Sequence, residues 1–284
     1  MRHKIALISD IHGNSAALAA VVADIKAKHI PESWFLGDLF LPGPGGDDLF
    51  DLLDAANTTI LIRGNWDDRV LNILSAHPQI NTKKDTGVYK AILAKFVAER
   101  LSSENIKRMH KMQQQVFRTV NGLKIGLTHN LPTRNYGPAL GYAVEGAAFD
   151  ALFTEPNQDV AVYGHIHHQV LRYSSHDQLV VNPGSVGRPY SKHKKANQDR
   201  RAQYAILTID DTGVADVTYQ KVAYNPEPML QKAAMMGLPY VSIYRQILAQ
   251  SAPEKVYMAP VHQINHDNHY VDELKSYLVK QKQS

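Results

Sequence analysis

The chain has 284 residues, of which 44% are hydrophobic and 20% are charged, a composition that is typical of a globular protein and excludes a disordered one. Its 31 Lys and Arg residues against 27 Asp and Glu residues give a net charge of +4, so a nucleic-acid partner is not expected. The chain contains no cysteine, which excludes disulfides, thiolate zinc sites and cysteine nucleophiles. Apolar runs such as residues 16–23 are too short to cross a bilayer, and we expect a cytoplasmic protein without a membrane partner.

Short apolar runs flanked by turn residues predict buried strands, and apolar residues at helical spacing predict helices. The predicted strands, in chain order, are residues 4–8, 34–36, 58–62, 123–127, 160–163, 170–173, 179–181, 202–209 and 217–221. The predicted helices are residues 15–28, 68–74, 88–100, 103–112 and 143–153. Strands alternate with helices early in the chain and follow one another later, which favours a layered α/β domain.

Two segments divide this pattern. Residues 76–118 are largely helical and polar, and we interpret them as a cap-like insertion over one end of the sheet, although plain connecting helices explain them equally well. The Pro-rich segment at 225–228 predicts a boundary. We therefore expect a main domain over residues 1–224 and a helical C-terminal extension over residues 225–284 that packs on it.

Side chains able to bind metal or phosphate recur where the predicted strands end. Five apolar runs are followed by such residues, namely Asp10 with His12, Asp38, Asn65, His129, and His165 with His167. Ligands of open α/β sheets collect outside the carboxyl ends of strands, so these side chains are expected to converge. An enclosed group of carboxylates and imidazoles needs a compensating cation. Nitrogen and oxygen donors without sulfur suit manganese, iron or zinc better than calcium.

The chain resembles the calcineurin-like metallophosphoesterase superfamily over roughly residues 4–188, through the motifs Asp10-Ile11-His12, Gly37-Asp38, Gly64-Asn65, His129 and Gly164-His165-Ile166-His167. The resemblance implies an α/β fold in which two packed β-sheets are flanked by helices as a four-layer sandwich. It also implies two metal ions, Mn²⁺ and/or Fe and alternatively Zn²⁺, which activate water and neutralise the phosphoryl oxygens. One ion would be held by Asp10, His12, Asp38 and His167, and the other by Asp38, Asn65, His129 and His165. The candidate catalytic residues are Asp38, Asn65, Asp67 and His129.

One position departs from the family pattern. Many members carry histidine after the Gly-Asn pair, where it acts as a general acid or steadies the transition state, whereas this chain has Trp66. An indole cannot give up a proton near neutral pH. A leaving group that needs no proton, such as the nucleotide released from a phosphoanhydride, fits this exchange. Trp66 could also stack on an adenine, or simply be a core aromatic below the metal loop.

Further residues are candidates for binding the substrate. Asn14 follows the first motif and could contact a phosphate, although capping of the first helix explains it fully. The turn after the strand at 179–181 contains Ser185 and Arg188, whose backbone N–H groups and guanidinium suit an anion. A basic loop at 192–201 could meet a polyphosphate, but solvated surface is the simpler explanation. The same holds for His262, His266 and His269, which would share one face of a helix.

A narrower resemblance comes from the Gly64-Asn65-Trp66-Asp67 variant, His129-Asn130-Leu131-Pro132 and Asn182-Pro183-Gly184-Ser185. They are similar to a branch of small bacterial phosphodiesterases and asymmetric diadenosine tetraphosphate hydrolases. We therefore expect hydrolysis of phosphoanhydride or phosphodiester bonds in nucleotide-like substrates, with ATP and AMP as products of diadenosine tetraphosphate. The alternatives are a general or cyclic-nucleotide phosphodiesterase, a serine/threonine-type phosphatase and a non-catalytic metal-binding scaffold. The oligomeric state stays open, a homo-oligomer included.

Overall fold

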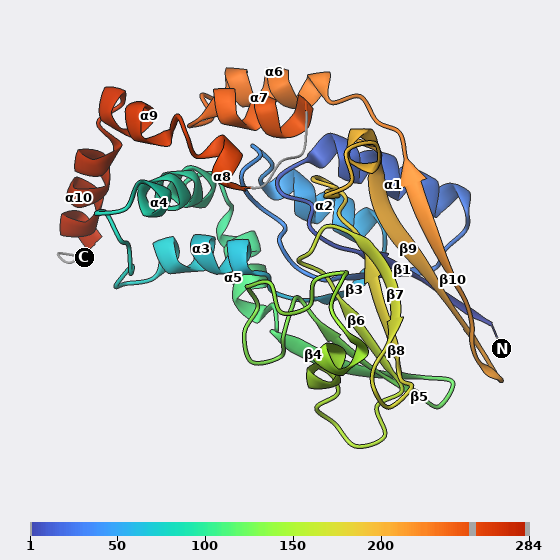
Figure 1. Cartoon of the computed structure of the whole chain (residues 1–284). Helices are drawn as coiled ribbons and strands as arrows, with labels where there is room; N and C mark the ends of the chain where they lie inside the picture. Colours follow the sequence, from blue (N-terminus) through green and yellow to red (C-terminus); the bar gives the residue numbers. More distant parts are fainter. Residues whose placement is uncertain (1, 250–253, 282–284) are drawn as a thin grey trace.

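The computed structural model describes residues 2–249 and 254–281, and its centre is a pair of five-stranded mixed sheets that face each other (Figure 1). The first sheet has the order β10-β9-β1-β2-β3, with bounds Gly213–Val222, Ala202–Asp210, His3–Ile8, Glu32–Phe35 and Thr58–Leu61. The second has the order β4-β5-β6-β8-β7, with bounds Gln115–Val120, Leu123–Thr128, Val160–Tyr163, Leu179–Pro183 and Gln169–Tyr173. The expected pair of sheets with flanking helices is confirmed.

Each sheet contains three neighbouring parallel strands, which lie in the middle of the second sheet and reach the edge of the first at β3. β1, β2 and β3 are parallel neighbours, and so are β5, β6 and β8. Strands buried on both faces are continuously apolar, as in residues 5–8 and 160–163. The two sheets bury one shared apolar layer, to which the first contributes Leu7 and Trp34 and the second Leu127 and Val162. Because the carboxyl ends of these parallel strands point to the same end of the sandwich, the loops that follow them meet there.

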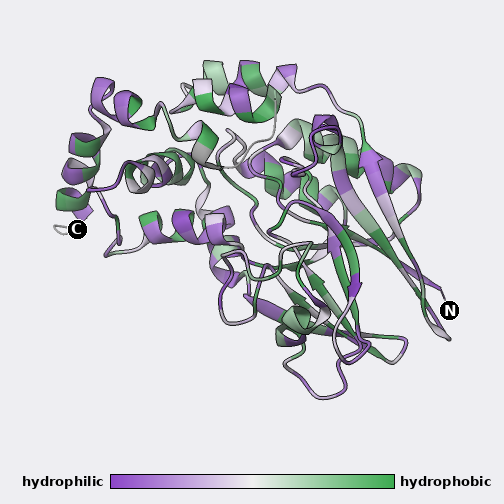
Figure 2. Ribbon diagram, in the orientation of Figure 1, coloured by the Kyte–Doolittle hydropathy of each residue, from purple (hydrophilic) through white to green (hydrophobic). Residues whose placement is uncertain are grey.

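Helices cover the outer face of the first sheet and extend to one side of it (Figures 1 and 2). Asn14 Oδ1 accepts from Ala17 N at 3.0 Å and caps α1, Ser15–Ala27, whose apolar stripe faces the sheet. A helix that was not predicted, α2 (Asp47–Ala55), buries Leu49, Phe50 and Leu53 beside it. Apolar residues one and four positions apart were the sequence signal for that helix.

The region interpreted as an insertion contains three helices and ends in a strand. Their bounds are α3 Asn65–Leu74, α4 Asp85–Ala98 and α5 Ser103–Lys111. Helix α3 begins at Asn65 rather than at residue 68, so the third motif forms its first turn. Residues 115–118, expected as part of the cap, belong to edge strand β4, which pairs with β5. The helical segment therefore ends at Lys111.

The C-terminal extension is helical and packs against α1 and α4 (Figure 1). Its helices are α6 Glu227–Met235, α7 Val241–Ala249, α8 Glu254–Tyr257, α9 Val261–Asp267 and α10 Tyr270–Gln281. Tyr240, Ile243 and Leu274 lie in the same apolar cluster as Ile92 of α4. None of the described helices is long and apolar enough to span a bilayer.

The outer face of the second sheet has a thinner cover than expected. The predicted helix at 143–153 is instead a 3-10 helix over Gly146–Leu152 within a long loop. Phe149 and Leu152 are buried against Tyr163 and Val180 of this sheet. The tighter helix places the two apolar residues three positions apart on the same face, which suffices to close this part of the core.

Candidate metal centre

The seven side chains predicted as metal ligands follow parallel strands of both sheets. Asp10 and His12 come after β1, Asp38 after β2 and Asn65 after β3. His129 follows β5, while His165 and His167 follow β6. The structure gathers six of them into two groups, each with ligand atoms within 4.8 Å of one another, namely Asp10, His12 and His167, and Asp38, His129 and His165. Asn65 lies beside the second group, because the terminal nitrogen of its side-chain amide is 2.9 Å from His165 Nδ1.

Hydrogen bonds to backbone carbonyls fix the orientation of three imidazoles. The Nδ1 atom of His12 lies 2.6 Å from Leu41 O, that of His167 lies 2.8 Å from Arg188 O, and that of His129 lies 2.7 Å from Leu36 O. A carbonyl oxygen can only accept, so each Nδ1 carries a proton. The Nε2 atom of each ring therefore turns its lone pair, or a second proton, into the site.

The first group has the chemistry of an enclosed cation site. His12 Nε2 and His167 Nε2 face each other at 2.9 Å, while the Nδ1 atom of each ring is engaged with a backbone carbonyl. Burial, together with the nearby His12 and Arg188, lowers the pKa of His167 and outweighs the attraction of Asp10, which keeps that ring neutral. Asp10 Oδ1 is buried and has no hydrogen-bond donor among the described residues, although it lies 3.2 Å from His167 Nε2. A metal ion between these three atoms would satisfy all of them.

Asp10 is held by its other carboxylate oxygen. Oδ2 accepts from Ser9 Oγ at 2.6 Å and from the backbone N–H of His165 at 2.9 Å. Burial alone would raise the pKa of Asp10, but the surrounding imidazoles hold it well below its ordinary value. The carboxylate is therefore ionised and has one oxygen fixed and one available to a metal.

Asp38 lies between the two groups. Its Oδ1 accepts from Trp66 N at 2.8 Å, while its Oδ2 lies 3.4 Å from His129 Nε2 and 3.8 Å from His12 Nε2. One oxygen thus faces a ligand of each group. This is the position that a bridging carboxylate requires.

The second group carries a proton when no metal is bound. Although burial opposes the charged form, the Asp38 carboxylate raises the pKa of His129 to about 10. Burial and the neighbouring His129 lower the pKa of His165 to about 4, so that ring is neutral. A metal ion in this group would have to displace the His129 proton, because it needs the Nε2 lone pair.

The backbone at the site is unusual. Five of the predicted ligands have φ between 54° and 69°, namely Asp10, His12, Asp38, His165 and His167. This left-handed region is uncommon for residues with a side chain and persists only where the surroundings impose it. Asp10 N bonds to Gly37 O and His12 N to Asp38 O, so the loops after β1 and β2 hold each other in this conformation.

Asp67, a predicted catalytic residue, has its carboxylate bonded to backbone amides. Its Oδ2 accepts from the N–H groups of Asp38 and Gly64, and its Oδ1 from that of Leu39, all at 2.9 Å. Burial and the nearby Asp38 raise the pKa of Asp67 to about 7 against the effect of these donors. This side chain connects the loops after β2 and β3. Its hydrogen bonds all go to backbone N–H groups of these loops, and none goes to the side chain of a predicted ligand.

Two of the predicted substrate contacts, Asn14 and Ser185, make internal hydrogen bonds. Besides capping α1, Asn14 donates to Tyr224 Oη at 3.0 Å. Ser185 Oγ donates to Asp10 O at 2.7 Å and accepts from Arg188 N at 2.8 Å. Ser185 thereby fixes the backbone of Asp10, a predicted metal ligand, and its role toward a substrate stays a prediction.

The other two predicted substrate contacts are Trp66, whose indole ring lies beside a predicted ligand, and Arg188, which carries a positive charge. The Trp66 ring meets that of His12 edge-on at 6.2 Å, and Lys90 Nζ lies 5.7 Å from the Trp66 ring. The Arg188 guanidinium lies 5.3 Å from the ring of Tyr257, which is buried. No pattern in the sequence indicated Lys90 or Tyr257, because both lie on helices that approach the predicted ligands only through tertiary packing.

The remaining basic candidates lie outside the two metal groups. His262 contacts Asp85 at 3.0 Å and His266 contacts Asp267 at 3.2 Å, while His269 lies beyond the end of α9. In the basic loop, Arg200 donates to the carbonyls of Pro189 and Ile247, which ties the loop to α7. These contacts are structural, and the C-terminal histidines form no metal group among the described residues.

Two facing sheets that present two groups of Asp and His side chains at one end are consistent with a dinuclear metal site. Residues 3–212 match the family described as "Calcineurin-like phosphoesterase superfamily domain", and the chain belongs to this family of metallophosphoesterases. The expected family is thus confirmed, while its diadenosine tetraphosphate hydrolase branch is not distinguished.

The chain is also similar to individual proteins in sequence or in fold. An uncharacterized protein of Methanocaldococcus jannaschii, MJ0912, is 28% identical over 253 residues, which cover 84% of this chain and 95% of the relative. The hypothetical protein PH1004 of Pyrococcus horikoshii has a similar fold, with a TM-score of 0.70 at 17% identity over 88% of this chain and 99% of that one. A metallophosphoesterase of Sphaerobacter thermophilus gives a TM-score of 0.59 at 20% identity over 84% and 97%.

Proposed function

We propose that the protein hydrolyses phosphodiester or phosphoanhydride bonds in nucleotide-like substrates, and that diadenosine tetraphosphate, cleaved into ATP and AMP, is its substrate. The observation that carries the chemistry is Asp38, one oxygen of which faces His12 of one group and His129 of the other. Such an arrangement suits two divalent cations, for which we propose Mn²⁺ and/or Fe, with Zn²⁺ as the alternative.

In this proposal Asp10, His12, Asp38 and His167 hold one ion, and Asp38, Asn65, His129 and His165 hold the other. Bound ions of this kind lower the pKa of water and neutralise phosphoryl oxygens. The carbonyls of Leu36, Leu41 and Arg188 fix the ring orientations, which reduces the reorganisation that the reaction requires. Asp67 positions Asp38 through its backbone rather than exchanging a proton with the substrate.

The choice of an anhydride substrate is supported by Trp66. Its indole lies beside His12, where it has an N–H but no proton to transfer near neutral pH. A nucleoside polyphosphate is a weak base and leaves without protonation, whereas an alkoxide from a phosphomonoester does not. The Arg188 side chain lies close enough to His167 to lower its pKa, and we propose that it binds a phosphate oxygen.

Product analysis tests this proposal. Purified protein loaded with Mn²⁺ is incubated with diadenosine tetraphosphate, and the nucleotides are separated by ion-exchange chromatography. We expect equal amounts of ATP and AMP. Two ADP molecules would reject the asymmetric cleavage, whereas no turnover of the dinucleotide alongside cleavage of bis(p-nitrophenyl) phosphate would reject this substrate and favour a general phosphodiesterase. Asp38→Asn, which weakens the bridging ligand, is the matched inactive control.

A further inference from the structure

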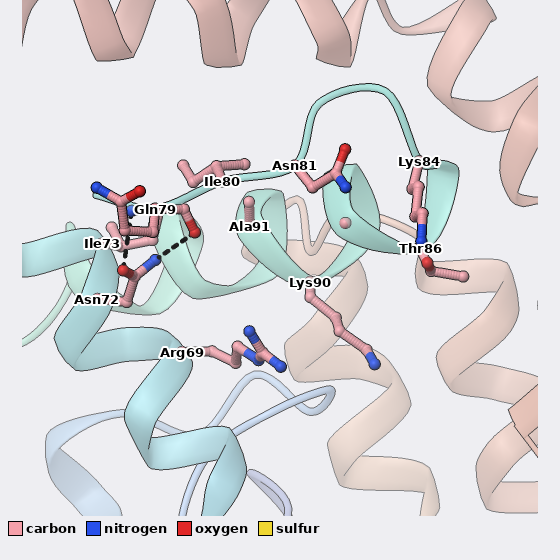
Figure 3. A pocket seen from close by; sticks show the side chains of 11 residues that line it. Arg69, Asn72, Ile73, Gln79, Ile80, Asn81, Lys84, Thr86, Lys90 and Ala91 are labelled. Atoms are coloured by element: carbon pink, nitrogen blue, oxygen red, sulfur yellow. Dashed lines mark hydrogen bonds between the residues drawn. The ribbon is translucent and has the colours of Figure 1, made fainter. Parts of the chain in front are cut away.

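A cavity of about 220 Å³ lies between α3 and α4, outside the metal centre (Figure 3). Three cationic side chains line it, Arg69 from α3 and Lys84 and Lys90 from the start and the second turn of α4. The other polar lining residues are amides and a hydroxyl, such as Asn72, Gln79 and Thr86, and no carboxylate is among them. The lining therefore suits an anion.

The cavity has a shape fixed by local structure. The Asn72 amide donates to Gln79 O at 3.2 Å and accepts from Gln79 N at 3.0 Å, which holds the connecting segment against α3 (Figure 3). At the other end this segment passes close to α4, where a Cβ atom on Gly87 would lie 2.2 Å from Asn81 O. Only glycine permits that approach, so the connection is built to close over the two helices.

Nearby carboxylates are engaged elsewhere. Asp68, next to Arg69 in the sequence, contacts Arg63 at 2.8 Å and accepts from Asn135 at 2.6 Å. Asp85, next to Lys84, contacts His262 and accepts from Asn265 at 2.9 Å. The carboxylates of Asp68 and Asp85, which adjoin Arg69 and Lys84 in the sequence, thus contact other partners.

The cavity also has a link to the metal centre. The Arg69 and Lys90 side chains extend into the same space on one side of α3 and α4 (Figure 3). Lys90 Nζ lies 5.7 Å from the Trp66 ring, and that ring lies 6.2 Å from the His12 ring. A substrate with a phosphoryl group at the ligands and a second charged group beyond Trp66 would reach this pair of cations.

We propose that the cavity between α3 and α4 binds a second phosphate group of the substrate, with Arg69 and Lys90 as the contacting residues. This assignment rests on the proposed hydrolysis of phosphoric diesters and anhydrides, and it adds that the preferred substrates carry more than one phosphate. Binding is electrostatic, and a guanidinium and an ammonium on adjacent helices contact one phosphate from two directions.

Two substrates that share one reacting group test the assignment. Thymidine 5'-(p-nitrophenyl phosphate) and its 3'-phosphorylated form release the same p-nitrophenolate and differ only in the second phosphate. With the Mn²⁺-loaded full-length protein, we expect the second phosphate to raise kcat/KM. The Arg69→Gln, Lys90→Gln double variant should reduce the ratio of the two kcat/KM values about tenfold, because each neutralised cation removes a charge-assisted hydrogen bond. Lys83→Gln, an exposed neighbour that does not line the cavity, should keep the ratio of the parent.

Direct binding separates failure of this assignment from failure of the proposed function. Inorganic pyrophosphate is titrated into the same loaded proteins by calorimetry, with metal content measured for each. We expect the double variant to bind pyrophosphate about tenfold more weakly at equal metal content. Equal affinities would overturn the anion site even if both diesters are hydrolysed. Weaker pyrophosphate binding with an unchanged substrate ratio would overturn the assignment to the substrate and indicate a free phosphate compound. A parent that hydrolyses neither diester would refute the proposed function instead.

Discussion

Gly64 lies so close to Asp38 that a Cβ atom at position 64 would be 2.1 Å from Asp38 Oδ1 and 2.3 Å from its backbone nitrogen. Neither contact can be relieved by rotating a flexible side chain, because the aspartate is held by Trp66 N and the backbone by Asp67. The glycine that begins the third motif therefore makes room for the Asp38 side chain rather than serving a turn.

Gly64→Ala should displace Asp38 and reduce kcat/KM for phosphodiester hydrolysis about 100-fold, the upper range for loss of a group that orients a metal ligand. Metal content measured by plasma emission spectroscopy should fall in parallel. Gly46→Ala is the control, because the nearest atom to its added Cβ is Arg100 O at 4.0 Å. Parental activity in Gly64→Ala would contradict the placement of Asp38.

Asp67→Asn tests whether this buried carboxylate positions Asp38. Both oxygens of Asp67 accept hydrogen bonds from backbone N–H groups. An amide has only one accepting oxygen, so the amide nitrogen introduced at this position would face at least one of these N–H donors without forming a hydrogen bond. We expect a loss of about 1–3 kcal/mol in the free energy of unfolding, measured with urea. Manganese affinity should also fall, whereas Asp51→Asn, at an exposed site on α2, should change neither quantity. A loss of activity with unchanged stability and metal affinity would instead favour a direct catalytic role.

Metal binding should release a proton from His129. Because Asp38 raises the pKa of His129 to about 10 in the metal-free protein, this ring is protonated at neutral pH and must become neutral to bind a metal. Calorimetric titration with Mn²⁺ in buffers of different ionisation enthalpy gives the number of protons released. We expect about one at pH 8 and less toward pH 10, where the ring has begun to lose its proton. His129→Ala should bind one metal less, and release of no proton by the parent would refute this assignment.

Trp66→His tests the leaving-group argument. Histidine at this position can transfer a proton to the departing oxygen, which assists alkoxide release far more than release of a nucleotide. The variant should therefore raise kcat/KM for a phosphomonoester relative to an anhydride, by about 100-fold at most. Trp66→Phe keeps an aromatic ring without the added acid and is the control. An equal ratio in parent and histidine variant would mean that another group protonates the leaving oxygen.

The C-terminal extension should contribute a pH-dependent interaction through Asp48 and Lys232. The ammonium of Lys232 lies 2.5 Å from Asp48 Oδ2 and, with Gly46 N–H, lowers the pKa of Asp48 against the effect of burial. A pKa below that of the unfolded chain stabilises the fold at neutral pH, and this stabilisation is lost as the pH falls through the pKa of the folded state. Asp48→Asn should cost about 0.5 kcal/mol at pH 7, because the pair is partly exposed, and less at acidic pH. A cost that is the same at both pH values would contradict the ion pair.

Much of the fold followed from local patterns. Apolar runs bounded by turns located the central strands, and Asn14 before an apolar stripe located the first helix, since both signals depend on near neighbours in the chain. Edge strand β4 was missed because its residues are half-exposed and lack a clear alternation. The segment expected as a helix over 143–153 forms a shorter 3-10 helix. One face of this short helix is enough to bury Phe149 and Leu152 against the second sheet.

The sequence by itself determined which residues are candidates for the metal centre, because Asp10, His12 and the later motifs each stand at the carboxyl end of a strand. Only the tertiary structure decided how they meet, since His12 and His167 are separated by 155 positions and become neighbours through the packing of two sheets. It also decided the contacts of Asp67, Lys90 and Tyr257. Those contacts depend on which backbone amide, ring or guanidinium lies opposite each side chain, and no spacing within a single segment contains that information.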